Sequence, residues 1–489
     1  MAQKGVGMEK TNRREFLARV ALSAGAGLVS GCACAKGAAK GAAGAPMRAF
    51  RCAPMKEGVR VGVVGVGSRG FGAVTRLLQV PGIRITAICD IRAPYAEKAA
   101  QAVFDETGVK PLVFSGTDEV YKRMCESPEV DAVYNCTSWN AHAPIAVFAM
   151  KAGKHVFIEV PSAMFVDECW ELVETAEACR VHCMQLENCC YGEEELLALN
   201  LCKFGMLGEL IHGEGGYLHD RRWKIFNSEE WEHWRNRWNE RHCGNYYLTH
   251  GLGPIALDMG INRGDRFDYL VSVDSHQAGY EAFARATLPA DHPLRNERFR
   301  MADMNVTTIR TAKGRTILLQ HDVTSPRPYS RLNLIAGTKG VFRGYPALGI
   351  CLEGKDEWPA VEHTDHEFLR TVRGELRLKY RHPLFKAVGE IAKKVGGHGG
   401  MDYIMDLRWA YCLQQGLPLD TDVYDLASWC AVSELTERSV LSRSAAMDVP
   451  DFTRGAWKTP CNSVLMDATV DLAKLDFSKV KAAKGQLNV

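Results

Sequence analysis

The stretch Val59-Arg-Val-Gly-Val-Val-Gly-Val-Gly-Ser-Arg-Gly70 decides the fold of this chain. It is a short apolar strand that ends in the series Gly65-x-Gly67-x-x-Gly70, and a second apolar run ends at Asp90, twenty residues further on. Gly65 allows a tight turn, Gly67 lets backbone approach a pyrophosphate, and Gly70 lets the following helix pack closely on the strand. The pattern therefore predicts a dinucleotide-binding unit in which a helix N-terminus faces the phosphates.

Asp90 indicates which dinucleotide is bound. An acidic residue in this position hydrogen-bonds the ribose hydroxyl of NAD, and its carboxylate would repel the 2′-phosphate of NADP. The alternative interpretation is a glycine turn in an unrelated α/β domain, and it leaves the combination of strand, glycines, helix and terminal acid unexplained. We therefore expect NAD as the cofactor.

Length and composition are typical of a soluble protein with two domains and tails. The 489 residues are 46% hydrophobic and 24% charged, and a chain of this length is too long for one ordinary core. The 60 basic and 58 acidic residues give a net charge of +2, so we expect no nucleic-acid partner. The 17 cysteines include no Cys-x-x-Cys pair; we expect no metal site and predict that most cysteines are small buried apolar residues.

The N-terminus has the pattern of an export signal. Asn12-Arg-Arg-Glu-Phe-Leu17 is a twin-arginine motif, and Val29-Ser-Gly-Cys32 after an apolar stretch matches a lipoprotein cleavage site. We predict that residues 1–31 are the signal, that Cys32 carries a lipid anchor, and that the Ala-, Gly- and Lys-rich residues 32–57 are a flexible tether. An accidental arginine pair before an apolar helix is the alternative.

Export constrains the cofactor chemistry. The twin-arginine route exports folded proteins, so NAD can be loaded in the cytoplasm before the protein reaches the periplasm or cell envelope. Little free NAD is available there, and an enzyme that released NADH at each turnover would soon stop. We therefore expect the NAD to be tightly bound and regenerated within each catalytic cycle.

Two patterns of hydrophobicity divide the rest of the chain. Residues 58–187 alternate apolar strands with helical stretches, which predicts an α/β Rossmann domain with a doubly wound parallel sheet. Residues 188–450 contain several strands in series, which predicts a C-terminal α+β substrate domain with a largely antiparallel open sheet. Residues 451–489 are predicted to be an extended tail. The strand-like runs of the second domain are 209–216, 269–276, 304–311, 316–323 and 332–336.

This arrangement resembles the glucose–fructose oxidoreductase/inositol dehydrogenase (Gfo/Idh/MocA) superfamily. Dehydrogenases of that superfamily have Glu-Lys-Pro where this chain has Glu159-Val160-Pro161, and valine cannot move the proton of a substrate hydroxyl as the lysine does. Other motifs resemble a narrower group, glycoside hydrolase family 109, known for NAD-dependent α-N-acetylgalactosaminidases. These motifs are Leu186–Gly192, Tyr217–Asp220, Trp234–Arg235, Tyr247–Pro254, Asn262–Arg266, Ser325–Tyr329 and Gly399–Asp402.

The resemblance implies two sets of site residues. The first set would contact NAD. It consists of Gly65, Gly67 and Gly70 of the glycine loop and of Ser68, Arg69, Asp90, Trp139, Asn140, Ala141, His142, Glu159, Val160 and Asn188. The sugar would contact Tyr217, Arg235, Tyr247, Leu248, Thr249, His250 and Tyr329. Leu248 stands where the family has proline, and Asn140 and Ala141 stand where larger residues are usual. These departures bear on the sugar preference more than on the reaction type.

The resemblance also implies a mechanism. NAD takes a hydride from C3 of the sugar, the ketone acidifies the C2 proton, the C1 substituent leaves by elimination, and water addition and re-reduction complete a net hydrolysis. His250 is the expected acid–base residue because imidazole titrates near neutrality, and Tyr217 and Tyr247 are expected to relay protons or donate hydrogen bonds. A structural histidine and packing tyrosines are the alternatives. Arg235, near Trp231, Trp234 and Trp238, is expected to hydrogen-bond the sugar unless it is a solvated surface arginine.

The predicted function is therefore an exported hydrolase of terminal α-linked N-acetylgalactosamine or a related sugar. One alternative is an oxidoreductase that forms a 3-keto sugar, and another is a non-catalytic sugar-binding lipoprotein. The resemblance allows a homo-oligomer, since the superfamily often dimerises through its open sheet. Asp402, at the start of a predicted helix, is expected to cap that helix.

Overall fold

The computed structural model describes residues 46–227, 234–353, 373–478, 480 and 481. The predicted export signal, the anchor at Cys32 and residues 33–45 of the predicted tether lie outside the described residues, as does Trp231. Within the part of the chain that is described, no helix combines the length and the apolar character needed to cross a membrane.

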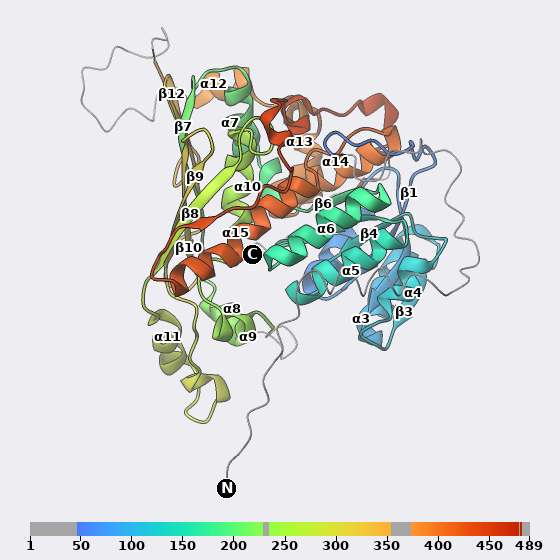
Figure 1. The fold of residues 1–489 in the computed structure, drawn as a ribbon. Helices are drawn as coiled ribbons and strands as arrows, with labels where there is room; N and C mark the ends of the chain where they lie inside the picture. The colour runs from blue at the N-terminus through green and yellow to red at the C-terminus, as the bar shows by residue number, and fades with distance from the viewer. Residues whose placement is uncertain (1–45, 228–233, 354–372, 479, 482–489) are drawn as a thin grey trace, which may run out of the picture. The chain divides into compact units, whose positions relative to one another are not determined.

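A six-stranded parallel sheet forms the first domain, as the alternation of strands and helices predicts (Figure 1). Its strand order is β3-β2-β1-β4-β5-β6, the doubly wound order in which the chain reverses direction beside β1. The strands are β1 (Val59–Val64), β2 (Ile83–Asp90), β3 (Leu112–Ser115), β4 (Ala132–Asn135), β5 (His155–Ile158) and β6 (Cys183–Gln185). The helices are α2 (Ser68–Leu77), α3 (Ala93–Thr107), α4 (Tyr121–Glu126), α5 (Trp139–Lys151) and α6 (Val166–Cys179).

The central strands are mainly apolar because helices cover both faces of the sheet. Every residue of β4 and β5 is buried. The edge strand β3 is also apolar, but it is short and Leu112 and Val113 are exposed; the sequence analysis did not predict this strand.

An eight-stranded sheet forms the second domain, in the order β13-β12-β11-β7-β10-β9-β8-β14. All of its pairings are antiparallel except β7 with β10, so the predicted largely antiparallel sheet is confirmed. The strands are β7 (Leu210–Leu218), β8 (Phe267–Asp274), β9 (Asn305–Thr311), β10 (Thr316–Asp322), β11 (Ser330–Gly337), β12 (Gly340–Arg343), β13 (Gly349–Leu352) and β14 (Met447–Asp448).

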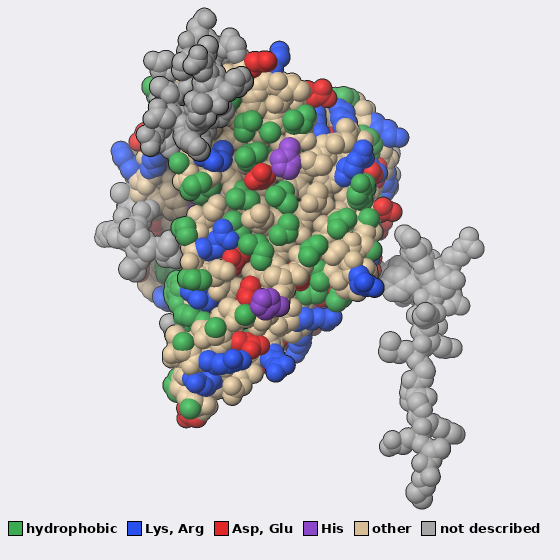
Figure 2. All heavy atoms as spheres, turned by 90° about the vertical axis from the view of Figure 1, so that its left-hand side faces the viewer, with side chains coloured by type: hydrophobic (Ala, Val, Ile, Leu, Met, Phe, Trp, Pro, Cys, Tyr) green, Lys and Arg blue, Asp and Glu red, His purple; other side chains and the backbone are tan. Residues whose placement is uncertain are grey.

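Helices cover one face of this sheet and leave the other open (Figure 1). Burial alternates strictly along β9, as expected for a strand with one covered and one solvated face. Figure 2 shows the open face, where hydrophobic side chains lie among charged ones; Ile211, Val273 and Val306 are exposed on these strands. The helices are α7 (Glu193–Lys203), α8 (Arg222–Asn227), α9 (Trp234–Arg241), α10 (Thr249–Asp258), α11 (Gly279–Thr287), α12 (Arg373–Tyr380), α13 (Pro383–Val395), α14 (Met401–Gln415) and α15 (Val423–Leu441).

Parts of two segments, the predicted flexible tether and the predicted extended tail, pack against the core. Met47, inside the predicted tether, is buried and its backbone N–H donates to Tyr424 Oη at 3.0 Å. In the predicted tail, Phe452 and Leu465 are fully buried and residues 451–478 form short turns against the core. Apolar side chains at these positions stabilise the packed state, which composition alone does not reveal.

A close contact between glycines fixes helix α10 against strand β7. A Cβ atom added at Gly251 would lie 2.2 Å from the backbone nitrogen of Gly216, and one added at Gly215 would lie 2.4 Å from the carbonyl oxygen of Gly251. Real side chains cannot occupy such distances. The glycines therefore let the start of α10, with His250, lie directly beside the end of β7, with Tyr217.

We expect Gly251→Ala to separate α10 from β7 and to lower the free energy of unfolding by about 1–3 kcal/mol, the usual cost of overpacking a core. Urea denaturation measures the change. Gly72→Ala in helix α2 is the matched control because an added Cβ meets nothing within 4 Å there. Equal stability of the two variants would contradict the contact.

Candidate active site

One cavity of about 1760 Å³ runs from the carboxyl ends of the parallel strands to the end of β7. Its wall includes the loop from Gly65 to Gly70, Asp90, and the start of α5 on one side. On the other side it includes Tyr217, Tyr247 and His250. Ligands of open α/β sheets bind at the carboxyl ends of the strands, and this space is larger than the 300–1,000 Å³ or so of a typical small-molecule site.

The glycine loop has the geometry of a phosphate cradle. Gly65 has a φ of +79°, and a Cβ there would lie 2.8 Å from the backbone of Cys136. A Cβ at Gly70 would lie 1.8 Å from the Gly65 carbonyl oxygen. Helix α2 begins at Ser68, has no acidic residue in its first turn, and no side chain caps it at Gly67. Its N-terminal N–H groups are therefore suited to bind a pyrophosphate.

Asp90 lies at the end of β2 in the position expected for the ribose-binding acid. Its carboxylate is buried and accepts hydrogen bonds from the backbone nitrogens of Val66 and Arg92, both at 2.9 Å. These bonds fix the carboxylate in the cavity wall beside the glycine loop. The residues present therefore fit NAD.

Asp402 is the centre of a charged cluster next to this loop. It accepts hydrogen bonds from Arg69 Nη1 at 2.8 Å, Asn188 Nδ2 at 2.5 Å and His398 Nδ1 at 3.0 Å. Burial alone would raise the pKa of Asp402, but the positive charges of Arg69 and Arg76 outweigh it and hold the pKa well below its usual range. Asp402 does not cap α14, because its oxygens bond side chains rather than backbone N–H groups.

The remaining residues predicted to bind NAD lie along the same wall. Arg69 Nε donates to Glu159 Oε1 at 2.6 Å. His142 bonds the carbonyl oxygens of Pro161 and Thr137, so its ring is held in place, and burial lowers its pKa. All of the following line the cavity: Ser68, Arg69, Trp139, Asn140, Ala141, His142, Glu159, Val160 and Asn188.

Aromatic side chains form the opposite end of the cavity. The ring of Tyr217 lies 4.7 Å from that of Tyr247, 5.6 Å from that of His250 and 6.0 Å from that of Tyr329, measured between ring centroids. Arg235 places its guanidinium 4.9 Å from the ring centroid of Tyr247 and 5.1 Å from that of Trp139. The structure thus brings together five of the residues predicted to contact the sugar.

Two other predicted sugar residues lie elsewhere. Leu248 is buried in the main hydrophobic core, and Thr249 is buried at the start of α10. Neither is among the residues that line the cavity. Tyr247 and His250 face the cavity, whereas Leu248, directly before α10, and Thr249, its first residue, face inward.

The tryptophans near Arg235 pack mainly against one another. The ring of Trp139 lies 4.9 Å from that of Trp234 and 5.9 Å from that of Trp238. Trp139 belongs to a small core cluster with Met164 and Tyr246. The tryptophans therefore support the wall beneath Arg235, and Trp234 and Trp238 also contribute to its surface.

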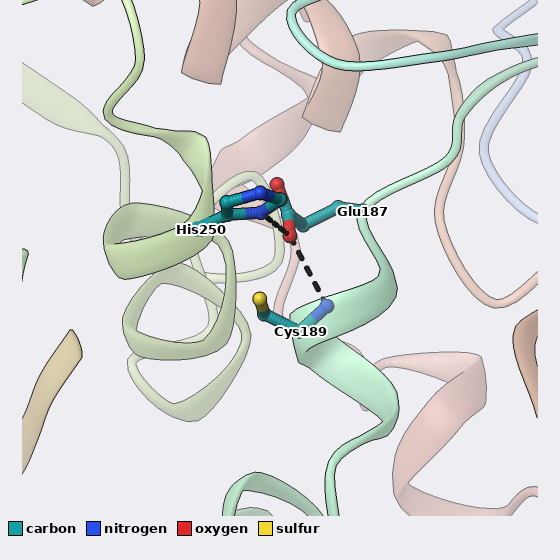
Figure 3. Close-up of side chains that lie close together, drawn as sticks. All are labelled: Glu187, Cys189 and His250. Atoms are coloured by element: carbon teal, nitrogen blue, oxygen red, sulfur yellow. Dashed lines mark hydrogen bonds and ion pairs between the residues drawn. The ribbon is translucent and has the colours of Figure 1, made fainter. Parts of the chain in front are cut away.

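Glu187 is a functional residue that the sequence analysis missed. Its Oε1 lies 2.6 Å from His250 Nδ1 and also accepts from the backbone nitrogen of Cys189 at 3.1 Å (Figure 3). Burial acts to raise the pKa of Glu187, but the adjacent His250 and the hydrogen bonds outweigh it and lower the pKa. A buried carboxylate paired with an imidazole orients the ring and stabilises its protonated form.

Glu187, Cys189 and His250 also have ligand-type atoms within 4.8 Å of one another. This spacing could accommodate a metal ion. Burial raises the pKa of the Cys189 thiol well above its usual range, which disfavours the thiolate that binds metals. The bond between Glu187 and His250 accounts for the geometry without a metal.

Two family models match the chain. The model described as "Glycosyl hydrolase 109, C-terminal domain" matches residues 191–459. The model described as "Oxidoreductase family, NAD-binding Rossmann fold" matches residues 59–185. Their boundary falls between the two sheets, so each model covers one end of the cavity.

Curated proteins are similar over most of their length. A protein of Shewanella sp. (strain MR-4) named "Glycosyl hydrolase family 109 protein 1" is 45% identical over 410 residues, which is 83% of this chain and 87% of that protein. A protein of Shewanella oneidensis named "Alpha-N-acetylgalactosaminidase" is 44% identical with the same coverage.

Solved structures of dehydrogenases share the fold. Levoglucosan dehydrogenase in complex with NADH and levoglucosan superposes with a TM-score of 0.59 at 18% identity, covering 81% of this chain and 100% of that one. Apo scyllo-inositol dehydrogenase from Lactobacillus casei gives a TM-score of 0.56 at 12% identity, covering 80% and 98%. At these identities the likeness concerns the fold alone.

We expect Asp402→Asn to lower the free energy of unfolding at pH 7 by about 3 kcal/mol, because it removes the buried carboxylate that Arg69 and Arg76 share. The folded-state pKa of Asp402 lies below the unfolded value of about 3.9, so its stabilisation is complete above that pH and is lost as the pH falls through the folded-state pKa. Urea denaturation between about pH 7 and pH 3 should show the difference between variant and wild type constant at first and then shrinking.

Asp258→Asn is the matched control. Both carboxylate oxygens of Asp258 are buried without a partner among the described residues, and burial raises its pKa well above the usual range. Its replacement should leave stability at pH 7 unchanged or higher. A loss for Asp258→Asn as large as that for Asp402→Asn would contradict the assigned role of the charged cluster.

Proposed function

Because the chain belongs to glycoside hydrolase family 109, we propose that it is an NAD-dependent glycosidase that releases terminal α-linked N-acetylgalactosamine or a closely related sugar. The observation that carries the proposal is the single cavity that has the glycine loop and Asp90 at one end and Tyr217, Tyr247 and His250 at the other. A sugar at the second end lies beside the cofactor. The name of the Shewanella oneidensis relative supports the choice of sugar.

The cofactor site is formed by the glycine loop, Asp90 and the ion pair of Arg69 with Glu159. NAD bound there supplies a hydride acceptor that is also the hydride donor at the end of the cycle. The chain's own task is to hold the sugar against it and to move protons. Val160 is buried in the cavity wall and has no proton to exchange. The proton transfers are therefore carried out by residues at the end of the cavity that contains His250.

His250 is positioned to take the proton from C2 of the sugar once oxidation at C3 has made that proton acidic. Glu187 accepts a bond from one ring nitrogen, so it orients the other nitrogen and stabilises the imidazolium that forms. Glu187 is thus a positioning residue. Departure of the C1 substituent, addition of water and return of the hydride to C3 then complete the hydrolysis without a pair of catalytic carboxylates.

The tyrosines serve as hydrogen-bond donors. Burial raises the pKa of Tyr247 to about 12 and raises that of Tyr329 further, so both hydroxyls keep their protons at neutral pH. Protonated hydroxyls can donate to sugar oxygens, and the rings of Tyr217 and Tyr247 give an apolar wall against which a sugar can stack.

We also propose that the protein acts outside the cytoplasm with resident NAD. The twin-arginine motif and the Cys32 site support export and a lipid anchor. A cofactor recycled within each turnover suits a compartment without a supply of NAD. Purified protein should then carry bound nucleotide and work without added NAD.

An aryl N-acetyl-α-galactosaminide in deuterated water tests the function. With no NAD added, we expect release of the aryl group and a free sugar that carries deuterium at C2, because the C2 proton exchanges with solvent before water addition. Mass spectrometry or NMR of the sugar measures it. Accumulation of a keto sugar would indicate an oxidoreductase instead, and absence of any reaction would indicate a binding protein.

His250→Ala belongs in the same experiment. Turnover should be abolished while bound NAD, measured by absorbance after denaturation, stays at the wild-type level. Normal turnover of this variant would remove His250 from the mechanism.

We expect Glu187→Gln to lower kcat by about 10²-fold with a smaller change in KM, since a neutral amide cannot stabilise the imidazolium. Glu177→Gln is the matched control: Glu177 is also buried and paired, with Tyr424 Oη at 2.6 Å and Arg454 Nη1 at 2.7 Å, but lies outside the cavity. It should retain the wild-type kcat. Equal kcat values for the two variants would show that Glu187 does not assist His250.

A further inference from the structure

Arg221 is a cavity residue that neither the fold nor the proposed reaction requires. It lies between β7 and α8, lines the cavity and is half-buried. Its Nη1 donates to Tyr217 Oη at 3.2 Å, and its backbone nitrogen donates to the carbonyl oxygen of Val323 at 3.1 Å. The guanidinium is thus directed at a tyrosine of the sugar end of the cavity.

Arg221 differs from other cavity arginines in its charge balance. Arg69 pairs with Glu159, and Arg331 pairs with Glu195 at 2.6 Å. Arg221 has no carboxylate within ion-pair distance among the described residues, and the groups that raise its pKa against the effect of burial are tyrosines.

A second arginine at the same end shows the same imbalance. Arg235 lies over the rings of Tyr247, Trp139 and Trp234 and forms no ion pair within the described part of the chain. His219 nearby lines the cavity too, and burial followed by the charge of Arg221 lowers its pKa to about 4, so it is neutral at pH 7. The sugar end therefore holds two guanidinium charges around the Tyr217–Tyr247 pair.

A partly desolvated charge without a counter-charge is costly unless a ligand supplies the opposite charge. The planar guanidinium matches sulfate and carboxylate groups through paired hydrogen bonds. A neutral hydroxyl or amide could accept one of these bonds but would leave the charge uncompensated. The geometry at Arg221 thus favours an anion in the bound sugar.

We propose that the natural substrate carries an anionic substituent, a sulfate ester or a uronate carboxylate, which Arg221 binds with Arg235 as the second cation. The inference rests on the proposed function, and that function limits where a sulfate can be. Oxidation at C3 requires a free O3, so a sulfate on the reacting sugar would be at O4 or O6. A uronate would belong to the neighbouring sugar unit.

Kinetics on matched substrates test the proposal. The substrates are p-nitrophenyl N-acetyl-α-galactosaminide, its 4- and 6-O-sulfated forms, and a disaccharide of N-acetylgalactosamine linked α to a uronic acid. We expect kcat/KM of the holoenzyme to be at least about tenfold higher for one anionic substrate than for its neutral counterpart, as hydrogen bonds to charged groups are worth about that factor or more. Which substrate gains distinguishes sulfate from carboxylate.

Arg221→Gln should remove the preference by raising KM for the anionic substrate more than KM for the neutral one. Arg222→Gln is the matched control, because Arg222 is the adjacent residue, is paired bidentately with Asp220 at 2.8 and 2.9 Å, and does not line the cavity. It should keep the preference. An enzyme with no preference for any anionic substrate, or an Arg221→Gln variant that retains it, would overturn the proposal.

Binding measurements separate this inference from the proposed function. If none of the glycosides is hydrolysed, the glycosidase proposal fails, and calorimetric titration of the holoenzyme with N-acetylgalactosamine, its 4- and 6-sulfates and galacturonate still tests Arg221. An anionic sugar should bind at least about tenfold more tightly than the neutral sugar. This difference in affinity should be present in the wild type and absent from Arg221→Gln. Equal affinities for neutral and anionic sugars would overturn it. Thermal unfolding of each variant confirms that it is folded.

Discussion

The charged cluster around Asp402 is the interaction on which the rest of the site depends. One buried carboxylate accepts bonds from Arg69 in helix α2, which follows the glycine loop, and from Asn188, the neighbour of Glu187 in the chain. A buried charge of this kind is stable only while its partners stay in place. The cluster therefore holds helix α14, the glycine loop and the segment that carries Glu187 in one arrangement, and the cofactor and sugar ends of the cavity keep a constant spacing.

Local patterns in the sequence predicted both sheets because most of their strands carry their own hydrophobic signal. The short strands β3, β12, β13 and β14 were not predicted. Helix α10 carried no such signal. Its sequence, Thr249–Asp258, contains two glycines and a proline, and no helix was predicted there. Gly251 lets the helix contact β7, and a contact between distant segments leaves no periodic trace in the sequence.

The site residues divide in the same way, into those with a local sequence signal and those whose role depends on contacts between distant segments. The glycine fingerprint identified Asp90 directly, and the family motifs identified His250. Glu187 and Asp402 were missed in their roles because their partners are 63 and 333 residues away in the chain. Their neighbours in sequence give no indication of a buried charge, whereas the structure shows each carboxylate beside its cation. Leu248 and Thr249 were predicted to contact the sugar because the whole Tyr247–His250 motif was assigned from the family resemblance, whereas the structure buries both side chains away from the cavity.

This burial has a consequence for how substrate range can evolve. Within the Tyr247–His250 motif, mutations at Leu248 disturb core packing and are removed by selection for stability rather than for activity. Variation that tunes specificity is thereby confined to side chains on the cavity wall, Arg221 and Arg235 among them. Directed evolution toward a new glycan should accordingly randomise those wall positions and leave Leu248 fixed.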